Sequence, residues 1–176
     1  HPTEVSEPLR ARLCTWTEEQ AGRRVRAQGG ERLRTMWVAD GDRSLIVHLE
    51  GRGFGRSEES MLYLERPLTG TLPAPRLPDG FCVRSVSGEQ EAVQQAAASH
   101  AAFESSRPLH RYVENYRQFM RSPVYEADRD LMIEAPDGSI AAFALFWLDR
   151  ANRVGYFEPV GVHPVYRGRG LGKALL

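Results

Sequence analysis

The feature that most constrains this chain is a glycine-rich run near its end, Arg167-Gly168-Arg169-Gly170-Leu171-Gly172-Lys173. It follows an apolar segment over 154–162 that is expected to form a strand, and it leads into the start of a helix. Glycine removes side chains and permits tight turns, so successive N–H groups can face one anion. A helix start adds unpaired N–H donors and the positive end of its dipole. The run therefore predicts a strand–loop–helix unit that binds a diphosphate through its backbone.

Basic side chains surround this predicted site, because Arg167, Arg169 and Lys173 can supply positive charge to phosphate oxygens. Two other glycine-rich phosphate motifs do not fit the spacing. The Rossmann fingerprint has glycine at its first, third and sixth positions, whereas these glycines stand at alternate positions. The P-loop needs Ser or Thr after Gly-Lys, but Gly172-Lys173 is followed by Ala174.

A proline-rich stretch over 67–80 divides the chain, since prolines at this density indicate a linker or an extended crossover. We expect three parts: residues 1–68, a linker over 69–80, and a domain over 81–176. The first part predicts two helices, Glu7 to Ala27 and Ser44 to Glu50, the second capped by Asp40 or Asp42. It also predicts two strands, Arg32 to Val38 and Glu59 to Glu65.

The part after the linker predicts the order β-α-α-β-β-β-α, an α/β or α+β layered domain. Ser87 is expected to cap a long helix whose apolar face holds Val93, Ala97 and Ala101, and Pro108 to open a second helix. The predicted strands are 81–86, 131–135, 140–148 and 154–162, with the second and third joined as a hairpin through Pro136-Asp137-Gly138.

Composition excludes several function classes. Lys plus Arg and Asp plus Glu both number 23, so the formal net charge is zero and gives no reason to expect nucleic acid or an anionic membrane as a partner. The longest apolar run, Ile140 to Leu148, is far too short to cross a bilayer. Cys14 and Cys82 lack metal-ligand spacing, which predicts no metal site and a reduced, cytoplasmic protein.

The run from Glu158 to Gly172 resembles the acetyl-CoA signature of the GNAT superfamily of N-acetyltransferases. Its Arg/Gln-x-x-Gly-x-Gly/Ala pattern is matched by Arg167, Gly170 and Gly172, and the resemblance extends over about 81–176. It implies a mixed, splayed β-sheet flanked by helices and transfer of an acetyl group from acetyl-CoA to an amine. A non-catalytic acyl-CoA-binding or regulatory module is the alternative, because a cofactor cradle alone does not fix an activity.

The resemblance also implies roles for individual residues. Amides of Val160, Gly161 and Val162 would pair with the pantetheine arm, and the loop would hold the pyrophosphate through the amides of Gly168, Arg169, Gly170, Leu171, Gly172 and Lys173. Pro159 would mark the bulge where two strands separate. Glu158 is the candidate base, weighed evenly against a solvated glutamate at a strand end. The tyrosine acid usual in the family would lie after Leu176.

The acceptor is expected to be a small-molecule or peptide amine, and a homodimer is left open. Ser105, Ser106 and Arg107, between the two predicted helices, are candidates for the acceptor pocket. Tyr112, Tyr116 and Phe119 are interpreted as core residues in preference to pocket residues.

The part before the linker resembles the back half of a second, degenerate copy of the same domain. The stretch from His48 to Phe54 is similar to the family's closing Tyr-x-x-x-Gly-Phe pattern, with Leu49 where the tyrosine would stand. His1-Pro2 then aligns with His163-Pro164, and Leu9 and Leu13 also match. Both ends read as cut, so the chain is interpreted as a fragment of a tandem protein resembling mycothiol-synthase-type acetyltransferases.

Overall fold

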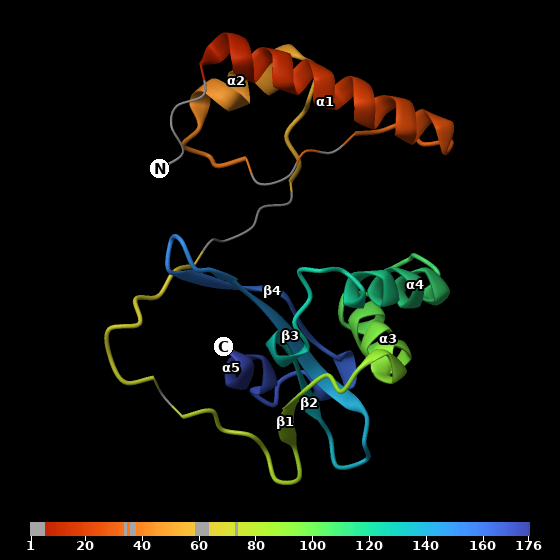
Figure 1. Ribbon diagram of the computed structural model, residues 1–176, viewed down its shortest axis with the longest axis vertical. Helices are drawn as coiled ribbons and strands as arrows, with labels where there is room; N and C mark the ends of the chain where they lie inside the picture. Colours follow the sequence, from red (N-terminus) through yellow and green to blue (C-terminus); the bar gives the residue numbers. More distant parts are fainter. Residues whose placement is uncertain (1–5, 34, 36–37, 59–63, 73) are drawn as a thin grey trace. The chain divides into compact units, whose positions relative to one another are not determined.

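The computed structural model describes residues 6–33, 35, 38–58, 64–72 and 74–176. The chain forms two compact units, His1–Arg66 and Pro67–Leu176, which are treated separately below (Figure 1).

The first unit consists of helices α1 (Glu7–Ala27) and α2 (Arg43–Gly51). Asp42 caps α2, because its Oδ1 accepts a hydrogen bond of 3.0 Å from the amide of Leu45. Arg52, which follows α2, donates to the Glu18 carboxylate of α1 at 2.8 Å. Both predicted helices are therefore confirmed, and Asp42 is the cap of the second.

The strands predicted for the first unit do not appear in its described residues. Residues 32, 33, 35 and 38 are not in a strand, so the strand expected over 32–38 is wrong for them. A single strand without a hydrogen-bonded neighbour leaves its backbone groups unpaired, and local β propensity does not offset that cost. The strand expected over 59–65 lies largely outside the described residues, and Leu64 and Glu65 are not in a strand.

The second unit has the predicted order of elements, and the α/β fold class is confirmed. Its strands are β1 (Cys82–Ser85), β2 (Asp130–Glu134), β3 (Ile140–Asp149) and β4 (Val154–Val162). They form one sheet in the order β1-β2-β3-β4, and every pair of neighbours is antiparallel. Helices α3 (Ala92–Ala102) and α4 (Leu109–Met120) connect β1 to β2, and α5 (Leu171–Leu175) follows β4.

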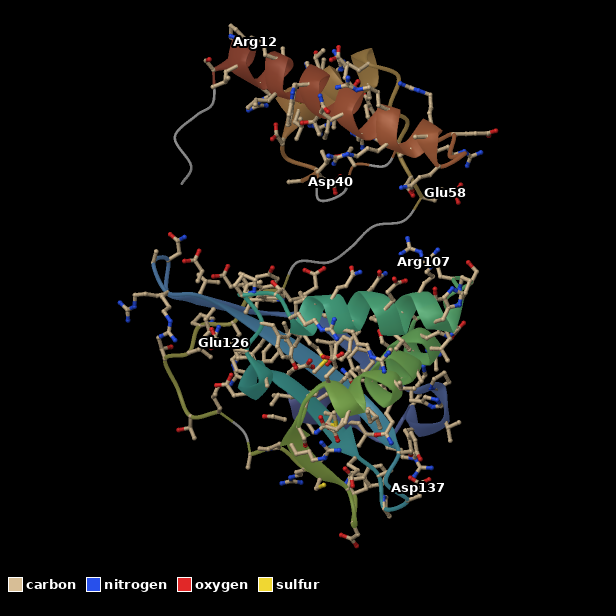
Figure 2. All side chains as sticks on the ribbon, turned by 45° about the vertical axis from the view of Figure 1, so that its right-hand side comes forward. Arg12, Asp40, Glu58, Arg107, Glu126 and Asp137 are labelled. Atoms are coloured by element: carbon tan, nitrogen blue, oxygen red, sulfur yellow. The ribbon has the colours of Figure 1, made fainter. Side chains whose placement is uncertain are left out.

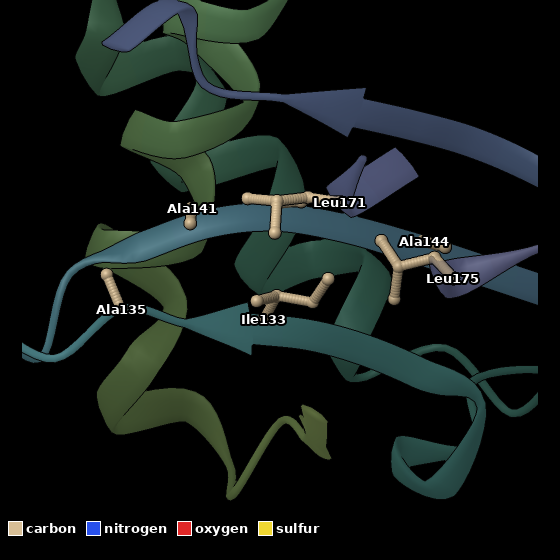
Figure 3. Packing of buried hydrophobic residues seen from close by; sticks show 7 residues of the cluster. Ile133, Ala135, Ala141, Ala144, Leu171 and Leu175 are labelled. Atoms are coloured by element: carbon tan, nitrogen blue, oxygen red, sulfur yellow. The ribbon is translucent and has the colours of Figure 1, made fainter. Parts of the chain in front are cut away.

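The sheet has a helix layer on each face: α3 and α4 lie on one side and α5 on the other (Figure 1). Successive strand residues point to opposite faces, so neighbouring side chains enter different cores. Met132 and Phe143 pack in the cluster that includes Ala98 of α3. Ile133, Ala142 and Ala144 pack with Leu171 and Leu175 of α5, and the small alanine side chains leave room for the two leucines (Figure 3).

The start of α3 differs from the expectation. Ser87 does not cap the helix; a 3-10 turn over Glu89–Glu91 comes first, and the amide of Ser87 donates to the Glu91 carboxylate at 2.6 Å. The buried face of α3 consists of Ala92, Gln95, Ala96 and Ala98, whereas Val93 is 45% exposed. The apolar spacing therefore misplaced Val93, whereas Ala97 and Ala101 are half-buried.

Candidate functional site

The glycine-rich loop has the backbone form that the sequence predicted. Gly168 and Gly170 both adopt left-handed conformations, with φ of +79° and +78°. Open space surrounds both residues, since a Cβ placed on either would meet no atom within 4 Å. Gly170 is the N-cap of α5, and its carbonyl accepts the first helical hydrogen bond, from Ala174 at 3.1 Å. The buried side chains of Leu171 and Leu175 fix α5 on the sheet.

The amides of this loop are available to a ligand. Within the described part of the chain, the N–H groups of residues 168–173 have no hydrogen-bond acceptor. Gly168, Arg169 and Gly170 are exposed and Gly172 is half-buried, so the backbone at these residues is open to solvent, whereas Leu171 between them is buried. Arg169 and Lys173 carry exposed cationic side chains beside these amides. Such an arrangement fits an anion with several oxygens, in particular a diphosphate.

Arg167 is placed differently from the other two cations. Its guanidinium donates to Glu104 Oε1 at 2.8 Å and to the carbonyl oxygen of Ala102 at 2.9 Å. The contacts link the loop to the C-terminal end of α3. The Arg167 side chain is therefore already paired, and its first effect is to hold the loop in place.

Tyr166 fixes the other side of the loop. Its hydroxyl lies 2.7 Å from Ser139 Oγ and donates to Asp137 Oδ2 at 3.2 Å, in the turn between β2 and β3 where Figure 2 labels Asp137. Hydrogen bonds from Ser139, the largest cause, hold the pKa of the Asp137 carboxyl below its usual range. The guanidinium carbon of Arg169 stands 5.5 Å from the centre of the Tyr166 ring.

Strand β4 contains the bulge that was predicted at Pro159. Ala144 pairs with Val160 and Phe146 pairs with Phe157, so Leu145 alone faces both Glu158 and Pro159. Trp147 Nε1 donates to the carbonyl oxygen of Glu158 at 2.8 Å. This hydrogen bond fixes the backbone of Glu158 in the bulge. The Glu158 side chain is exposed and forms no hydrogen bond with the described residues.

The amides of β4 beyond the bulge face two directions. The amide of His163 donates to the Ala141 carbonyl at 2.9 Å, and bonded pairs alternate along an antiparallel ladder. Gly161 therefore directs its amide to Phe143 of β3, whereas Val160 and Val162 direct theirs to the free edge of the sheet. Gly161 also permits close packing, since a Cβ there would clash with the Phe143 ring and lie 3.0 Å from Cβ of Ala102.

A cavity of about 380 Å³ lies between the sheet and the α3–α4 layer. Glu158 and Pro159 line it, together with the aromatic side chains of Tyr112, Tyr116 and Phe119. The interpretation of these aromatic residues as core was therefore wrong. From the connection between the helices, Arg107 contributes to the cavity. Ser105 instead stabilises the connection, its Oγ accepting from the Arg107 amide at 3.2 Å.

Sequence reasoning missed the deepest polar residue of the cavity, Asp130. It is 2% exposed, and its Oδ2 accepts hydrogen bonds from the hydroxyls of Tyr116 and Tyr125, the second at 3.1 Å. Burial raises the pKa of the Asp130 carboxyl, and the two tyrosine hydrogen bonds oppose that rise. Burial and the neighbouring Asp130 charge raise the pKa of both tyrosines, so their hydroxyls stay protonated and donate. The only sequence signal was a carboxylate directly before an apolar strand.

Neither a metal-binding cluster nor a membrane-spanning helix occurs in the described residues. They contain no group of three or more His, Cys, Asp and Glu side chains placed to hold a metal ion. None of the helices in this part of the chain combines the length and apolar character needed to span a bilayer.

Comparisons with known proteins agree with this geometry. Residues 94–176 match the profile of the family described as "Acetyltransferase (GNAT) family". The mycothiol acetyltransferase of Streptomyces coelicolor is 31% identical over 156 residues, which are 88% of this chain and 50% of that protein. That of Kineococcus radiotolerans is 31% identical over 156 residues, covering 86% and 50%. The chain thus spans about half the length of these curated relatives.

A solved structure supports the fold. The GCN5-related N-acetyltransferase from Sphaerobacter thermophilus superposes with a TM-score of 0.63 and 21% identity over 99% of this chain and 55% of that one.

Proposed function

Because residues 94–176 belong to the acetyltransferase (GNAT) family, we propose that this protein transfers an acetyl group from acetyl-CoA to an amine. The observation that carries the proposal is the loop before α5. Its amides over 168–173 have no acceptor among the described residues, the loop is exposed over 168–170, and Gly168 and Gly170 take left-handed conformations there. A backbone cradle with adjacent cations is the donor set that a pyrophosphate requires.

The proposed cofactor-binding residues divide by role. The amides of Gly168, Arg169, Gly170, Leu171, Gly172 and Lys173 bind the pyrophosphate, and the side chains of Arg169 and Lys173 add charge. Arg167 lies beside the loop, held by the Ala102 carbonyl and by Glu104, and its guanidinium is a further cation for the phosphates. The edge-facing amides of Val160 and Val162 are donors for the pantetheine arm, and Gly161 lets β4 pack closely on Phe143.

Acetyl-CoA, when bound, supplies the thioester whose acetyl group is transferred. Glu158 is the proposed base, because it lines the cavity at the bulge that interrupts the pairing of β4 with β3. A carboxylate there can take a proton from an ammonium group and leave the amine free to react. The hydrogen bond from Trp147 holds the backbone of Glu158, so the Cα atom that carries the Glu158 side chain has a fixed position.

One observation favours a second candidate, a module that binds acyl-CoA without turning it over. The Glu158 side chain is exposed and has no hydrogen-bond partner among the described residues that would fix it as a base. In that case the cradle would bind the cofactor, and no acceptor would be acetylated.

The experiment that separates the two combines calorimetry with a turnover assay. Titration of the protein with acetyl-CoA tests the cradle, and release of free thiol in the presence of a panel of primary amines tests transfer. Binding with amine-dependent thiol release supports the acetyltransferase. Binding without release from any amine supports the module, and absence of binding contradicts both.

We also propose that the first unit is the back half of a degenerate copy of the same domain. In the register that aligns His1 with His163, Leu9 and Leu13 of α1 correspond to Leu171 and Leu175 of α5. The α5 leucines are buried, whereas Leu9 and Leu13 are 46% and 50% exposed. If the proposal is right, a structure of the complete protein will have both α1 leucines packed on a β-sheet; a solvent-exposed pair there would contradict it.

A further inference from the structure

The cavity beside Glu158 contains two hydrogen-bond acceptors that the protein leaves unused. Gln95 of α3 lines the cavity and is 4% exposed, and its Oε1 is buried without a hydrogen-bond partner. Asp130 lines the same cavity, and both of its tyrosine donors bind Oδ2. Its Oδ1 forms no hydrogen bond with the described residues. A buried acceptor without a donor destabilises the folded protein, so the unpartnered Oε1 of Gln95 calls for an explanation.

The surroundings of these two atoms specify what would satisfy them. A carboxylate oxygen and an amide oxygen can only accept, so a ligand must bring donors to them. None of the ion pairs among the described residues includes Asp130. Arg107 also lines the cavity, together with the polar side chains of Ser99 and Asn115. Much of the remaining wall is aromatic: the ring of Phe119 lies 6.2 Å from that of Tyr116 and 5.9 Å from that of Trp147. Such a wall suits an apolar or cationic body.

We propose that this cavity selects an acceptor that carries, besides its reacting amine, a second hydrogen-bond donor, a hydroxyl or an ammonium group, which binds Asp130 Oδ1 and Gln95 Oε1. The inference rests on the proposed function, since it places the reacting amine at Glu158 in the same cavity. Tyr116 and Tyr125 act as positioning residues, because their hydroxyls occupy Oδ2 and leave Oδ1 for the ligand.

The test compares three series of probes: straight-chain α,ω-amino alcohols, the corresponding α,ω-diamines, and alkylamines of the same lengths. Thiol release gives kcat/KM for each, and calorimetry on the same protein gives affinity independently of turnover. At the best chain length we expect an amino alcohol or a diamine to exceed the matched alkylamine by about tenfold to a hundredfold, the range for a hydrogen bond to a charged acceptor. Preference for the diamine would identify the second group as ammonium, and preference for the amino alcohol as hydroxyl.

Gln95→Met is the decisive variant, because it replaces the side chain by an apolar one of similar length. Gln95 Oε1 makes no hydrogen bond, so we expect the variant to fold with an unchanged or higher Tm while the preference for a second donor falls several-fold. Gln94→Met, the same change on the exposed neighbour, is the matched control and should keep the preference. Asp130→Asn should reduce the preference further.

The outcomes separate this inference from the function on which it rests. If alkylamines react as well as the other two series, or if the preference survives in both Gln95→Met and Asp130→Asn, the inference is wrong while acetyl transfer stands. If no probe is acetylated but calorimetry gives a preference that Gln95→Met removes, the cavity assignment holds and acetyl transfer fails. If neither turnover nor binding distinguishes the series, the inference is overturned.

Discussion

The guanidinium of Arg167 lies 2.8 Å from the carboxylate of Glu104, across the gap between the glycine-rich loop and the end of α3. The two residues stand 63 positions apart in the sequence. Both side chains are largely exposed, at 48% and 70%, so the pair contributes little to overall stability. Its importance is local: a carboxylate stands beside a loop that we propose binds an anion, and it competes with phosphate for the same guanidinium.

Removing that competition should strengthen cofactor binding. For Glu104→Gln we expect CoA to bind about twofold to fivefold more tightly, the range of an exposed ion pair, with the gain shrinking as salt is added. Calorimetry at low and high ionic strength measures both effects. Glu114→Gln on α4, which removes another exposed carboxylate that is paired with an arginine, is the control. Weaker binding in Glu104→Gln would mean that the carboxylate supports the loop instead of competing with the ligand.

The cradle itself can be tested by filling it. Gly170→Glu places a side chain and a negative charge where the open amides lie, so we expect CoA affinity to fall by at least about a hundredfold. The control is Gly53→Glu in the first unit, because Gly53 also has a left-handed φ, +86°, and open space around it. Both variants should lose about 1 kcal/mol of stability from backbone strain, but the control should retain binding. Equal CoA affinities in the two variants would show that the phosphate site does not lie in this loop.

Glu158 should affect turnover and not cofactor affinity. For Glu158→Gln we expect kcat to fall by about a hundredfold, the usual contribution of a positioned general base. Steady-state kinetics together with acetyl-CoA calorimetry checks both. A loss of acetyl-CoA binding in this variant would make Glu158 a structural residue of the bulge.

Acid should destabilise the second unit through a paired carboxylate. Arg84 donates to both oxygens of Glu91, at 2.7 and 3.0 Å, and this contact, the largest cause, lowers the pKa of Glu91 below its usual value of 4.5. A carboxyl whose pKa is lower in the folded state stabilises the fold above the unfolded pKa, and that stability is lost as pH falls through the folded value. The stability that this contact contributes should therefore be constant above about pH 5 and fall below it.

Denaturant unfolding as a function of pH measures this contribution. Glu91→Gln should reduce stability at neutral pH by about 2 kcal/mol, the range for a hydrogen bond to a charged group, and should flatten the decline in acid. Glu114→Gln is the control, since the Glu114 side chain is 52% exposed. An equally steep acid decline in Glu91→Gln would assign the sensitivity to other carboxylates.

The parts of the fold that depend on local pattern were predictable from sequence. The apolar runs of β3 and β4, the turn between β2 and β3, and the glycines before α5 each encode their structure within a few neighbouring residues. The buried face of α3 was not predictable, because it depends on a 3-10 turn that starts the helix late and on Phe143 of β3, which is distant in sequence.

The candidate site divides in the same way. The phosphate loop is continuous in sequence, so its glycines and arginines could be recognised together. The cavity combines Gln95 of α3, Tyr116 of α4 and Asp130 of β2, and the sheet brings them together only after folding. Tyr116 in particular has the spacing of a core residue on its helix, and its hydrogen bond to Asp130 is a tertiary contact that no helical pattern contains.

The most direct test of the account is a crystal structure of the protein with CoA bound. We predict that the pyrophosphate oxygens will lie within hydrogen-bond distance of the amides over 168–173, with Arg169 and Lys173 alongside. A nucleotide bound elsewhere on the chain, with those amides still facing solvent, would contradict the central claim.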